Sequence, residues 1–182
     1  EGMKTPKGFT EYAPINWLMS EKLDGYRARF NPVTKSFVSR QNKPYNAPQW
    51  FTDFMPKMDF DGELFCGREG FQKMGSVRKK IPVDEEWFKI KYYVYDAPEF
   101  EGTFSDRYKF LSKIVSKAQK IWSSIQDSNP ILKNVSCPLV LTKHYIVKNM
   151  EHMKEFYNTV LDIGGEGIML KDPLSMYENK RS

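Results

Sequence analysis

The sequence predicts an α+β domain. Several short runs rich in β-branched and aromatic residues are bounded by Gly, Pro, Asn or Asp, which is typical of buried strands. Two other segments carry apolar residues with the 3.6-residue period of an amphipathic helix. The chain has 182 residues, 40% of them hydrophobic and 28% charged. It is therefore long enough to bury a core of its own.

The expected strands are short and distributed along the whole chain. The opening stretch to Pro14 is expected to be an extended arm, and residues 41–48 a loop because they are polar and interrupted by proline. Asn31-Pro32 has the turn chemistry of a hairpin between two of the strands. The strands themselves are expected over residues 17–22, 26–30, 36–40, 60–66, 90–95, 139–142 and 168–170.

The first expected helix runs from Asp106 to about Ile125, with Ser105 as its N-cap. It should end before Ser128-Asn129-Pro130, since the residue before a proline is disfavoured in the helical region. The buried stripe is expected to comprise Leu111, Ile114, Val115, Ala118, Ile121, Trp122 and Ile125.

The second expected helix begins at Asn149, whose side chain can cap it, and ends at Gly164-Gly165. Its buried face is expected to comprise Met150, Met153, Tyr157, Val160 and Leu161.

The composition narrows the classes of partner. The net charge is +5, from 28 Lys and Arg against 23 Asp and Glu, which permits a polyanionic partner. The densest basic cluster, Arg78-Lys79-Lys80, fits either a solvated loop or contacts with phosphates. His144 and His152 lack cysteine partners at ligand spacing, so a zinc site is not expected.

The compartment is expected to be intracellular, without further definition. Cys66 and Cys137 are too few for a disulfide framework and fit a reducing interior. No apolar stretch approaches the ~20 residues that cross a bilayer, so no membrane partner is expected. The N-terminus lacks the apolar core of a signal peptide, although a processed start would look the same.

The most informative segment is Ser-Glu-Lys-Leu-Asp-Gly-Tyr-Arg, residues 20–27. Lys22 lies two residues before Asp24-Gly25, which favours a tight turn because glycine accepts positive φ. A lysine packed against protein loses water, its pKa falls, and the neutral amine becomes a nucleophile. Arg27, five residues later, can grip a phosphate. The segment alone also fits a surface turn.

Three further segments follow in order: Phe-Asp-Gly-Glu-Leu-Phe at 60–65, Lys-Tyr-Tyr-Val-Tyr-Asp-Ala-Pro at 91–98, and Gly-Gly-Glu-Gly-Ile-Met-Leu-Lys at 164–171. Together with residues 20–27 they resemble the motifs of ATP-dependent DNA ligases, most closely the small ligases of bacteria and DNA viruses. The resemblance implies a nucleotidyltransferase (ATP-grasp-like) fold, in which two antiparallel sheets flanked by helices surround a nucleotide pocket. It also implies that residues 1–182 form an adenylyltransferase domain.

The resemblance implies that Lys22 attacks the α-phosphate of ATP, forms a lysyl-AMP intermediate and releases pyrophosphate. Ser20 occupies the position that contacts adenine, largely through its backbone. Arg27 corresponds to an arginine that touches ribose or phosphate. Arg40 corresponds to one that engages the nucleotide or the 5′-phosphate of a nick; the alternative is a charge at a strand end.

The remaining implied ligands come from the later motifs. Glu63 corresponds to a ribose ligand that can also reach the metal, and Glu166 to the carboxylate associated with a divalent ion, Mg²⁺ or Mn²⁺. Tyr95 corresponds to the aromatic residue that stacks on the purine. Tyr93 lies on the same strand face, so the choice between the two tyrosines stays open. Lys171 is expected either to face phosphate or to be solvated.

In the resembling family, a Lys-x-Lys motif and an OB-fold domain follow these motifs, and both are absent from this chain, which stops at Ser182. The expected function is the monomeric catalytic domain of a ligase that seals nicked double-stranded DNA in repair, replication and recombination. The alternatives are a messenger-RNA capping guanylyltransferase, an RNA ligase, or a catalytically inactive nucleic-acid-binding module. The joint presence of Lys22, Glu63 and Glu166 argues against the inactive module.

Overall fold

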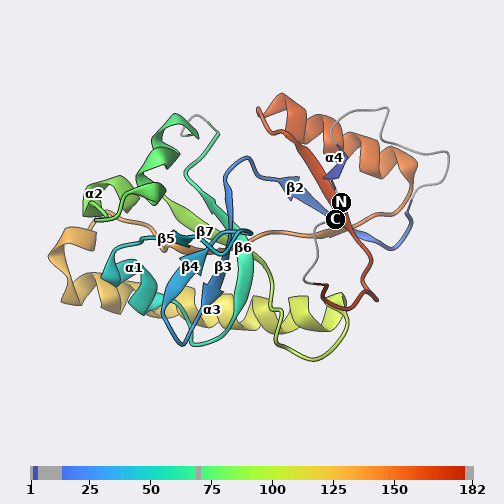
Figure 1. The fold of residues 1–182 in the computed structure, drawn as a ribbon. Coiled ribbons are helices and arrows are strands. Elements are labelled where there is room, and N and C mark those ends of the chain that lie inside the picture. Colours follow the sequence, from blue (N-terminus) through green and yellow to red (C-terminus); the bar gives the residue numbers. More distant parts are fainter. Residues whose placement is uncertain (1, 4–13, 69–70, 179–182) are drawn as a thin grey trace.

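The strands of the molecule form two sheets, which we call sheet A and sheet B (Figure 1). The structure is a computed structural model that describes residues 2–3, 14–68 and 71–178. Within these residues sheet A has four antiparallel strands, in the order β1 (Gly2–Met3), β10 (Gly167–Lys171), β2 (Leu18–Lys22) and β9 (Tyr145–Ile146). Sheet B has six, in the order β5 (Pro44–Tyr45), β4 (Ser36–Val38), β3 (Tyr26–Asn31), β6 (Phe60–Phe65), β7 (Lys91–Asp96) and β8 (Leu139–Leu141).

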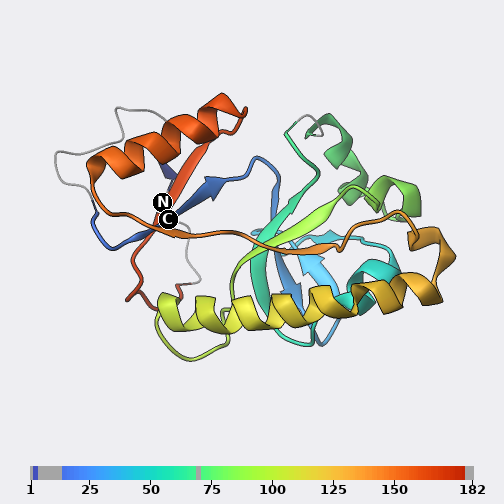
Figure 2. The same cartoon turned by 180° about the vertical axis from the view of Figure 1, so that it is seen from behind.

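Each sheet is covered by one of the two long helices (Figure 2). Helix α3 (Phe104–Ser128) runs along sheet B and contacts β7 and β8, while α4 (Met150–Asp162) packs on β10 of sheet A. Among the described residues, no helix combines the length and the apolar character that crossing a bilayer requires. The smaller helical elements are α1 (Gln49–Phe54), α2 (Asp84–Trp87) and the 3₁₀ helices η2 (Phe71–Arg78) and η3 (Pro130–Leu132).

The α+β class is confirmed, but one strand pair departs from the predicted antiparallel sheets. Strands β7 and β8 are parallel, with Tyr92 opposite Leu139 and Val94 opposite Leu141. The chain between them contains α3, and a helix of this length returns the chain to the same end of the sheet before the next strand begins. Sheet B is therefore mixed.

Alternation along the strands of sheet B separates an apolar face from a polar face. Ala28 and Phe30 of β3 are buried, as are Leu64 of β6 and Tyr92 of β7, and they pack in one aromatic-rich core. Tyr92 also donates a hydrogen bond of 2.7 Å to the carbonyl of Ala28, which satisfies its buried hydroxyl. The intervening residues of the same strands project from the opposite face, where the polar groups gather.

The helix boundaries correct several predictions. The N-cap of α3 is Thr103 and not Ser105, because Thr103 and Asp106 form a reciprocal capping box. The helix also includes Ser128. Ile121 was expected in the buried stripe but is 53% exposed, since Trp122 takes the inward position against Phe54.

Helix α4 begins and ends as predicted. Asn149 accepts from the backbone N–H of His152 at 2.8 Å, and Gly164, with φ +87°, follows the last turn. Met153, Tyr157 and Val160 are buried as expected, whereas Leu161 is 39% exposed because it lies at the margin of the apolar stripe.

The expected strands are present, and the hairpin through Asn31 is confirmed. The second strand of this hairpin ends at Val38, two residues early. The predicted loop 41–48 contains a short edge strand, β5, in which Pro44 needs no ladder N–H. Of the expected N-terminal arm, Gly2–Met3 pairs with β10, and residues 4–13 lie outside the described residues.

Candidate functional site

The candidate nucleophile, Lys22, lies at the end of β2 directly opposite Gly167 of β10. In the same pairing Ser20 lies opposite Met169, and alternation places Ser20, Lys22 and Met169 on one face of sheet A. Glu166 immediately precedes Gly167, so two motifs from opposite ends of the sequence meet at neighbouring strand ends. The other face of these strands packs under α4.

Gly25 is needed for close approach and not for a left-handed turn, which corrects the sequence argument. It does not adopt positive φ. A Cβ at this position would lie 2.2 Å from the carbonyl oxygen of Leu64 in β6, so only glycine fits. Its backbone N–H donates to Oε2 of Glu63 at 3.0 Å. The residues after Lys22 are thereby tied to the neighbouring sheet.

Arg27 is fixed on the polar face of sheet B by a bidentate ion pair with Asp61. Its Nε donates to Oδ1 at 3.2 Å and its Nη2 to Oδ2 at 2.7 Å. The Asp61 side chain is 1% exposed and that of Arg27 is 30% exposed, so the guanidinium still reaches the open side. The hydrogen bonds to Asp61 raise the pKa of Arg27, which stays protonated.

Glu63 lies opposite both Arg27 and Tyr93 in the strand register. Burial raises its pKa from 4.5 to about 7, although the Gly25 N–H and the Arg27 charge act in the opposite direction. At neutral pH the carboxyl is therefore partly protonated, and it can both donate to and accept from a ligand hydroxyl.

The two candidate stacking tyrosines have different surroundings. Tyr95 lies at an irregularity in the β6–β7 pairing, near the charges of Arg27, Glu63 and Asp61. Burial is the main reason that its pKa is raised. Tyr93 instead packs its ring against Phe65 at 5.7 Å and lies near the charges of Glu21 and Arg68. Tyr95 thus lies near both Arg27 and Glu63, whereas Tyr93 lies opposite Glu63 but packs its ring on Phe65.

Arg40 follows β4 and lines a pocket of about 420 Å³ together with Arg27 and Arg29. Ser39, Asn42 and Tyr177 also line this pocket. Three guanidinium groups around one hollow make an environment suited to phosphate, because each can hold phosphate oxygens in a planar fork. The structure therefore brings Arg27 and Arg40, both predicted, to one pocket.

Lys171 ends β10, and its Nζ lies 4.0 Å from Oδ2 of Asp96 and 5.4 Å from the ring centroid of Phe104. The side chain is 40% exposed. A protein carboxylate therefore lies within ion-pair distance of this lysine.

The carboxylates fit a divalent ion only in a sparse site. No group of three or more His, Cys, Asp or Glu side chains gathers as a metal cage in the part of the chain that the structure describes. Magnesium commonly uses one or two carboxylates and completes its shell with waters and substrate phosphates. Glu63 fits this pattern poorly, because its Oε2 already accepts from Gly25 and its pKa is near 7.

The basic cluster 78–80 has partners within the protein. The guanidinium of Arg78 lies 5.0 Å from the ring centroid of Tyr26, and Nζ of Lys79 lies 2.8 Å from Oε2 of Glu86. Cys66 and Cys137 are not joined in a disulfide.

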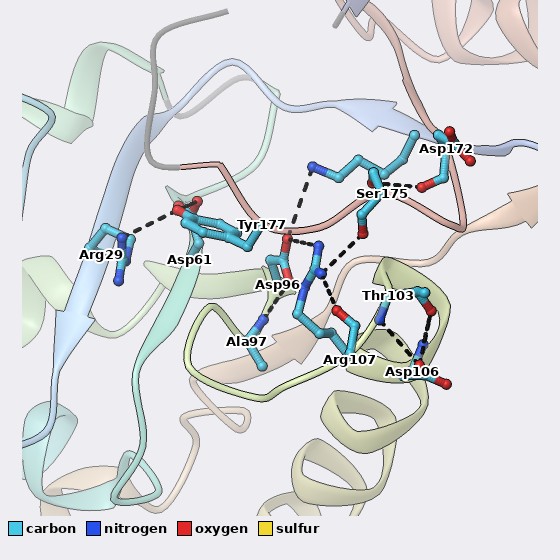
Figure 3. A network of polar contacts seen from close by, with 12 residues as sticks. Arg29, Asp61, Asp96, Ala97, Thr103, Asp106, Arg107, Asp172, Ser175 and Tyr177 are labelled. Atoms are coloured by element: carbon cyan, nitrogen blue, oxygen red, sulfur yellow. Dashed lines mark hydrogen bonds and ion pairs between the residues drawn. The ribbon is translucent and has the colours of Figure 1, made fainter.

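Several polar residues at this site escaped the sequence argument. Asp61 stands inside the 60–65 motif, where adjacency to Glu63 could have indicated it. Arg29 could have been found from its alternation with Arg27 along one strand. Tyr177 carried no local signal, yet its hydroxyl donates to Asp61 at 2.8 Å (Figure 3).

The two sheets, with a lysine at a strand end and arginines and carboxylates on the facing motifs, define a nucleotidyltransferase domain. The profile of the ATP dependent DNA ligase domain matches residues 3–182. The chain belongs to this family.

Individual relatives agree with this assignment. A DNA ligase of Haemophilus influenzae is 32% identical over 166 residues, which cover 91% of this chain and 55% of the relative. A structure described as a structure-function analysis of Lig E DNA ligases has a TM-score of 0.73 and 26% identity, covering 92% of this chain and 59% of that one. Chlorella virus DNA ligase-adenylate, at 20% identity, has the same fold with a TM-score of 0.70, covering 93% and 59%. The chain thus spans little more than half the length of these proteins.

Proposed function

We propose that this chain is the adenylyltransferase domain of an ATP-dependent DNA ligase. The observation that carries the proposal is the β2–β10 register, in which Lys22 lies opposite Gly167 and beside the Glu166 motif. Membership of the ATP dependent DNA ligase domain family supports the same reaction. A lysine in this setting acts as a covalent carrier of AMP.

The reaction proceeds in three displacements. First, Nζ of Lys22 forms a P–N bond with the α-phosphorus of ATP, the bond to the β-phosphate breaks, and pyrophosphate leaves while the amine loses a proton. Second, a 5′-phosphate oxygen of nicked DNA bonds to the adenylate phosphorus, the P–N bond breaks, and Nζ regains a proton. Third, the 3′-hydroxyl oxygen bonds to the 5′-phosphorus, AMP leaves, and the hydroxyl proton is released.

Each candidate ligand binds a different part of the nucleotide. Ser20 contacts adenine through its backbone, and Tyr95 stacks on the purine, where a flat π-face is a dispersion partner. Arg27 and Glu63 hold ribose and phosphate, which their direct opposition across β3 and β6 supports. These contacts orient the α-phosphorus for attack by Lys22.

The other candidate residues bind phosphate groups or the divalent metal ion. Arg40 binds the nucleotide or the 5′-phosphate of the nick, supported by its place in the arginine-lined pocket. Lys171 binds phosphate as well, because Asp96 is already paired with Arg107 and does not depend on the lysine for its counter-charge. Glu166, with Glu63 as the less suited second carboxylate, would hold Mg²⁺ or Mn²⁺, which neutralises triphosphate charge when bound.

Three further proposals concern the whole enzyme. We propose nicked double-stranded DNA as its substrate, an OB-fold domain with a Lys-x-Lys motif beyond residue 182, and a monomeric state. The family supports a nucleic-acid substrate.

The deciding experiment is covalent labelling. Incubation with ATP and Mg²⁺ should add one AMP, seen by intact mass, and the Lys22→Ala chain should add none. Lys22→Arg should also fail, because a guanidinium stays protonated and cannot attack. An adduct of equal yield on Lys22→Ala would refute the nucleophile. Parallel labelling with GTP tests the alternative: stronger labelling by GTP would assign the chain to capping enzymes.

A further inference from the structure

A short segment, Asp172–Tyr177, crosses from sheet A to sheet B, and we call it the strap (Figure 3). It leaves the end of β10, and its last residue contacts Asp61 of β6. On the way it meets the first turn of α3, where the N–H of Phe104 donates to the Ser175 carbonyl at 2.8 Å and the N–H of Ser105 to the Pro173 carbonyl at 2.9 Å. Backbone N–H groups of the first turn of α3, which have no acceptor within the helix, thus bind the strap.

A buried ion pair anchors the middle of the strap. Arg107 is 1% exposed and donates from Nε to Oδ1 of Asp96 at 2.7 Å and from Nη2 to Oδ2 at 3.3 Å. Its Nη1 donates to the carbonyls of Gly102 at 2.9 Å and Ser175 at 3.2 Å. One guanidinium therefore joins β7, the start of α3 and the strap, which leaves the strap little freedom to shift.

The end of the strap places Tyr177 in the arginine-lined pocket. Its hydroxyl donates to Oδ2 of Asp61 at 2.8 Å and accepts from Nη1 of Arg29 at 3.2 Å. Its ring centroid lies 5.4 Å from the guanidinium carbon of Arg29 and 5.9 Å from that of Arg107. The ring and the hydroxyl are thus both held by cationic groups.

Tyr177 and Arg27 meet at a single oxygen atom. Oδ2 of Asp61 accepts from the Tyr177 hydroxyl and also from Nη2 of Arg27 at 2.7 Å. Asp61 is 1% exposed, so water does not replace a lost donor there readily. The Tyr177 hydroxyl therefore shares with Arg27 the carboxylate oxygen that holds the Arg27 guanidinium.

We propose that Tyr177 is a positioning residue for nucleotidyl transfer, which acts through Asp61 by fixing the Arg27 guanidinium. The inference rests on the proposed function of Lys22 and Arg27. Lys22 belongs to sheet A and Arg27 to sheet B, and the strap joins the end of β10 in sheet A to Asp61, the ion-pair partner of Arg27 in sheet B. Because a small misplacement of a reacting group is costly in rate, a fixed Arg27 aligns the phosphate for Lys22.

The test compares two deletions of a single hydroxyl. Tyr177→Phe keeps the ring between the two arginines and removes only the bonds to Asp61 and Arg29. Tyr145→Phe, on the edge strand of sheet A, is the matched control, since its ring packs on Phe156 away from the pocket. In single-turnover AMP labelling at saturating ATP, Tyr177→Phe should slow the rate about tenfold, the effect of losing its hydrogen bond to the Asp61 carboxylate. Tyr145→Phe should match the unsubstituted chain.

A double-mutant cycle separates positioning from a general structural role. In an Arg27→Lys background the bidentate fork is gone, so adding Tyr177→Phe should slow labelling less than twofold further. Equal tenfold losses in both backgrounds would show that Tyr177 does not act through Arg27, and would overturn the inference. So would a Tyr177→Phe chain that labels at the full rate or that no longer folds by circular dichroism.

A second readout does not depend on activity. The Arg27 Nε–H proton, which donates to Asp61, should exchange with solvent faster and shift its nuclear magnetic resonance in Tyr177→Phe but not in Tyr145→Phe. An unchanged signal overturns the inference. Absence of any adduct on the unsubstituted chain would instead refute the proposed function, and the positioning role with it, whatever the resonance shows.

Discussion

Lys22 and Gly167 face each other across the antiparallel pairing of β2 with β10. A residue opposite the lysine that carries no side chain leaves room beside the amine, and the next group along the chain is the carboxylate of Glu166. The sheet register itself therefore places the proposed nucleophile opposite the glycine that follows Glu166.

Replacement of Tyr95 should separate stacking from hydrogen bonding. We expect Tyr95→Phe to retain most AMP labelling, because the role proposed for the ring is to stack on the purine, whereas Tyr95→Ala should lose much of it. Tyr93→Ala is the control, since Tyr93 packs on Phe65. Radiolabelled ATP at several concentrations provides the measurement; equal losses from Phe and Ala at position 95 would point to the hydroxyl instead.

Glu63 should give the protein a pH-dependent stability. The folded chain holds this proton up to about pH 7, and the unfolded carboxyl releases it near 4.5, so the free energy of unfolding falls as the pH rises between these values. Glu63→Gln cannot titrate. Its stability relative to the unsubstituted chain should therefore rise across this window, by on the order of 3 kcal/mol at most.

Urea unfolding of both chains between pH 4 and pH 8 measures this difference. His144 contributes a pH dependence of the opposite sign. Burial lowers its pKa from 6.5 to about 4, so unfolding takes up a proton between these values and the free energy of unfolding falls as the pH falls. That contribution is common to both chains and cancels in the comparison. A constant difference between them at every pH would contradict the assigned titration of Glu63.

Breaking the buried pair of Asp96 and Arg107 should be strongly destabilising. Arg107→Ala leaves the Asp96 carboxylate buried without its partner, which costs about 3–5 kcal/mol of unfolding free energy. The exposed pair Lys79–Glu86 is the control, and Lys79→Ala should cost less than about 1 kcal/mol. Urea denaturation checks both values, and similar costs for the two variants would show that burial does not decide the effect.

Nick sealing should require more than these 182 residues. Affinity for duplex DNA comes largely from Lys and Arg that neutralise phosphates, and this chain has a net charge of only +5. We expect weak, salt-sensitive binding and poor sealing by the chain alone, even when it is pre-charged with AMP. A gel ligation assay against a C-terminally extended chain measures this, and equal sealing rates would show that the segments beyond Ser182 are dispensable.

The sequence predicted the elements that carry the motifs because their patterns are local. Lys22 and Glu166 stand at the ends of short apolar strands, and Asn149 caps α4 with a recognisable side chain. The parallel pairing of β7 with β8 was not predictable in the same way, since the direction of β8 depends on the end of sheet B at which the chain leaves α3.

The site was less predictable where contacts join distant segments. Tyr177 reaches Asp61 only because the strap is held by the start of α3, which no local pattern encodes. Similarly, Gly25 carries a turn signature but is required by the Leu64 carbonyl of another strand. Local chemistry thus indicated which residue types matter, and tertiary contacts determined how they are held.

The strands of sheet A lie far apart in the sequence, and this affects the order in which the protein folds during synthesis. Its strands come from the two ends of the described chain, β1 and β2 from the beginning and β9 and β10 from the end, while sheet B comes from the middle. Pairings between such distant segments form late, because a large loop must close before they gain any contacts. During translation, sheet B can fold while Lys22 still waits for its neighbouring strand. A nascent chain on the ribosome therefore carries Lys22 in an unfinished sheet, which is completed only when β10 emerges.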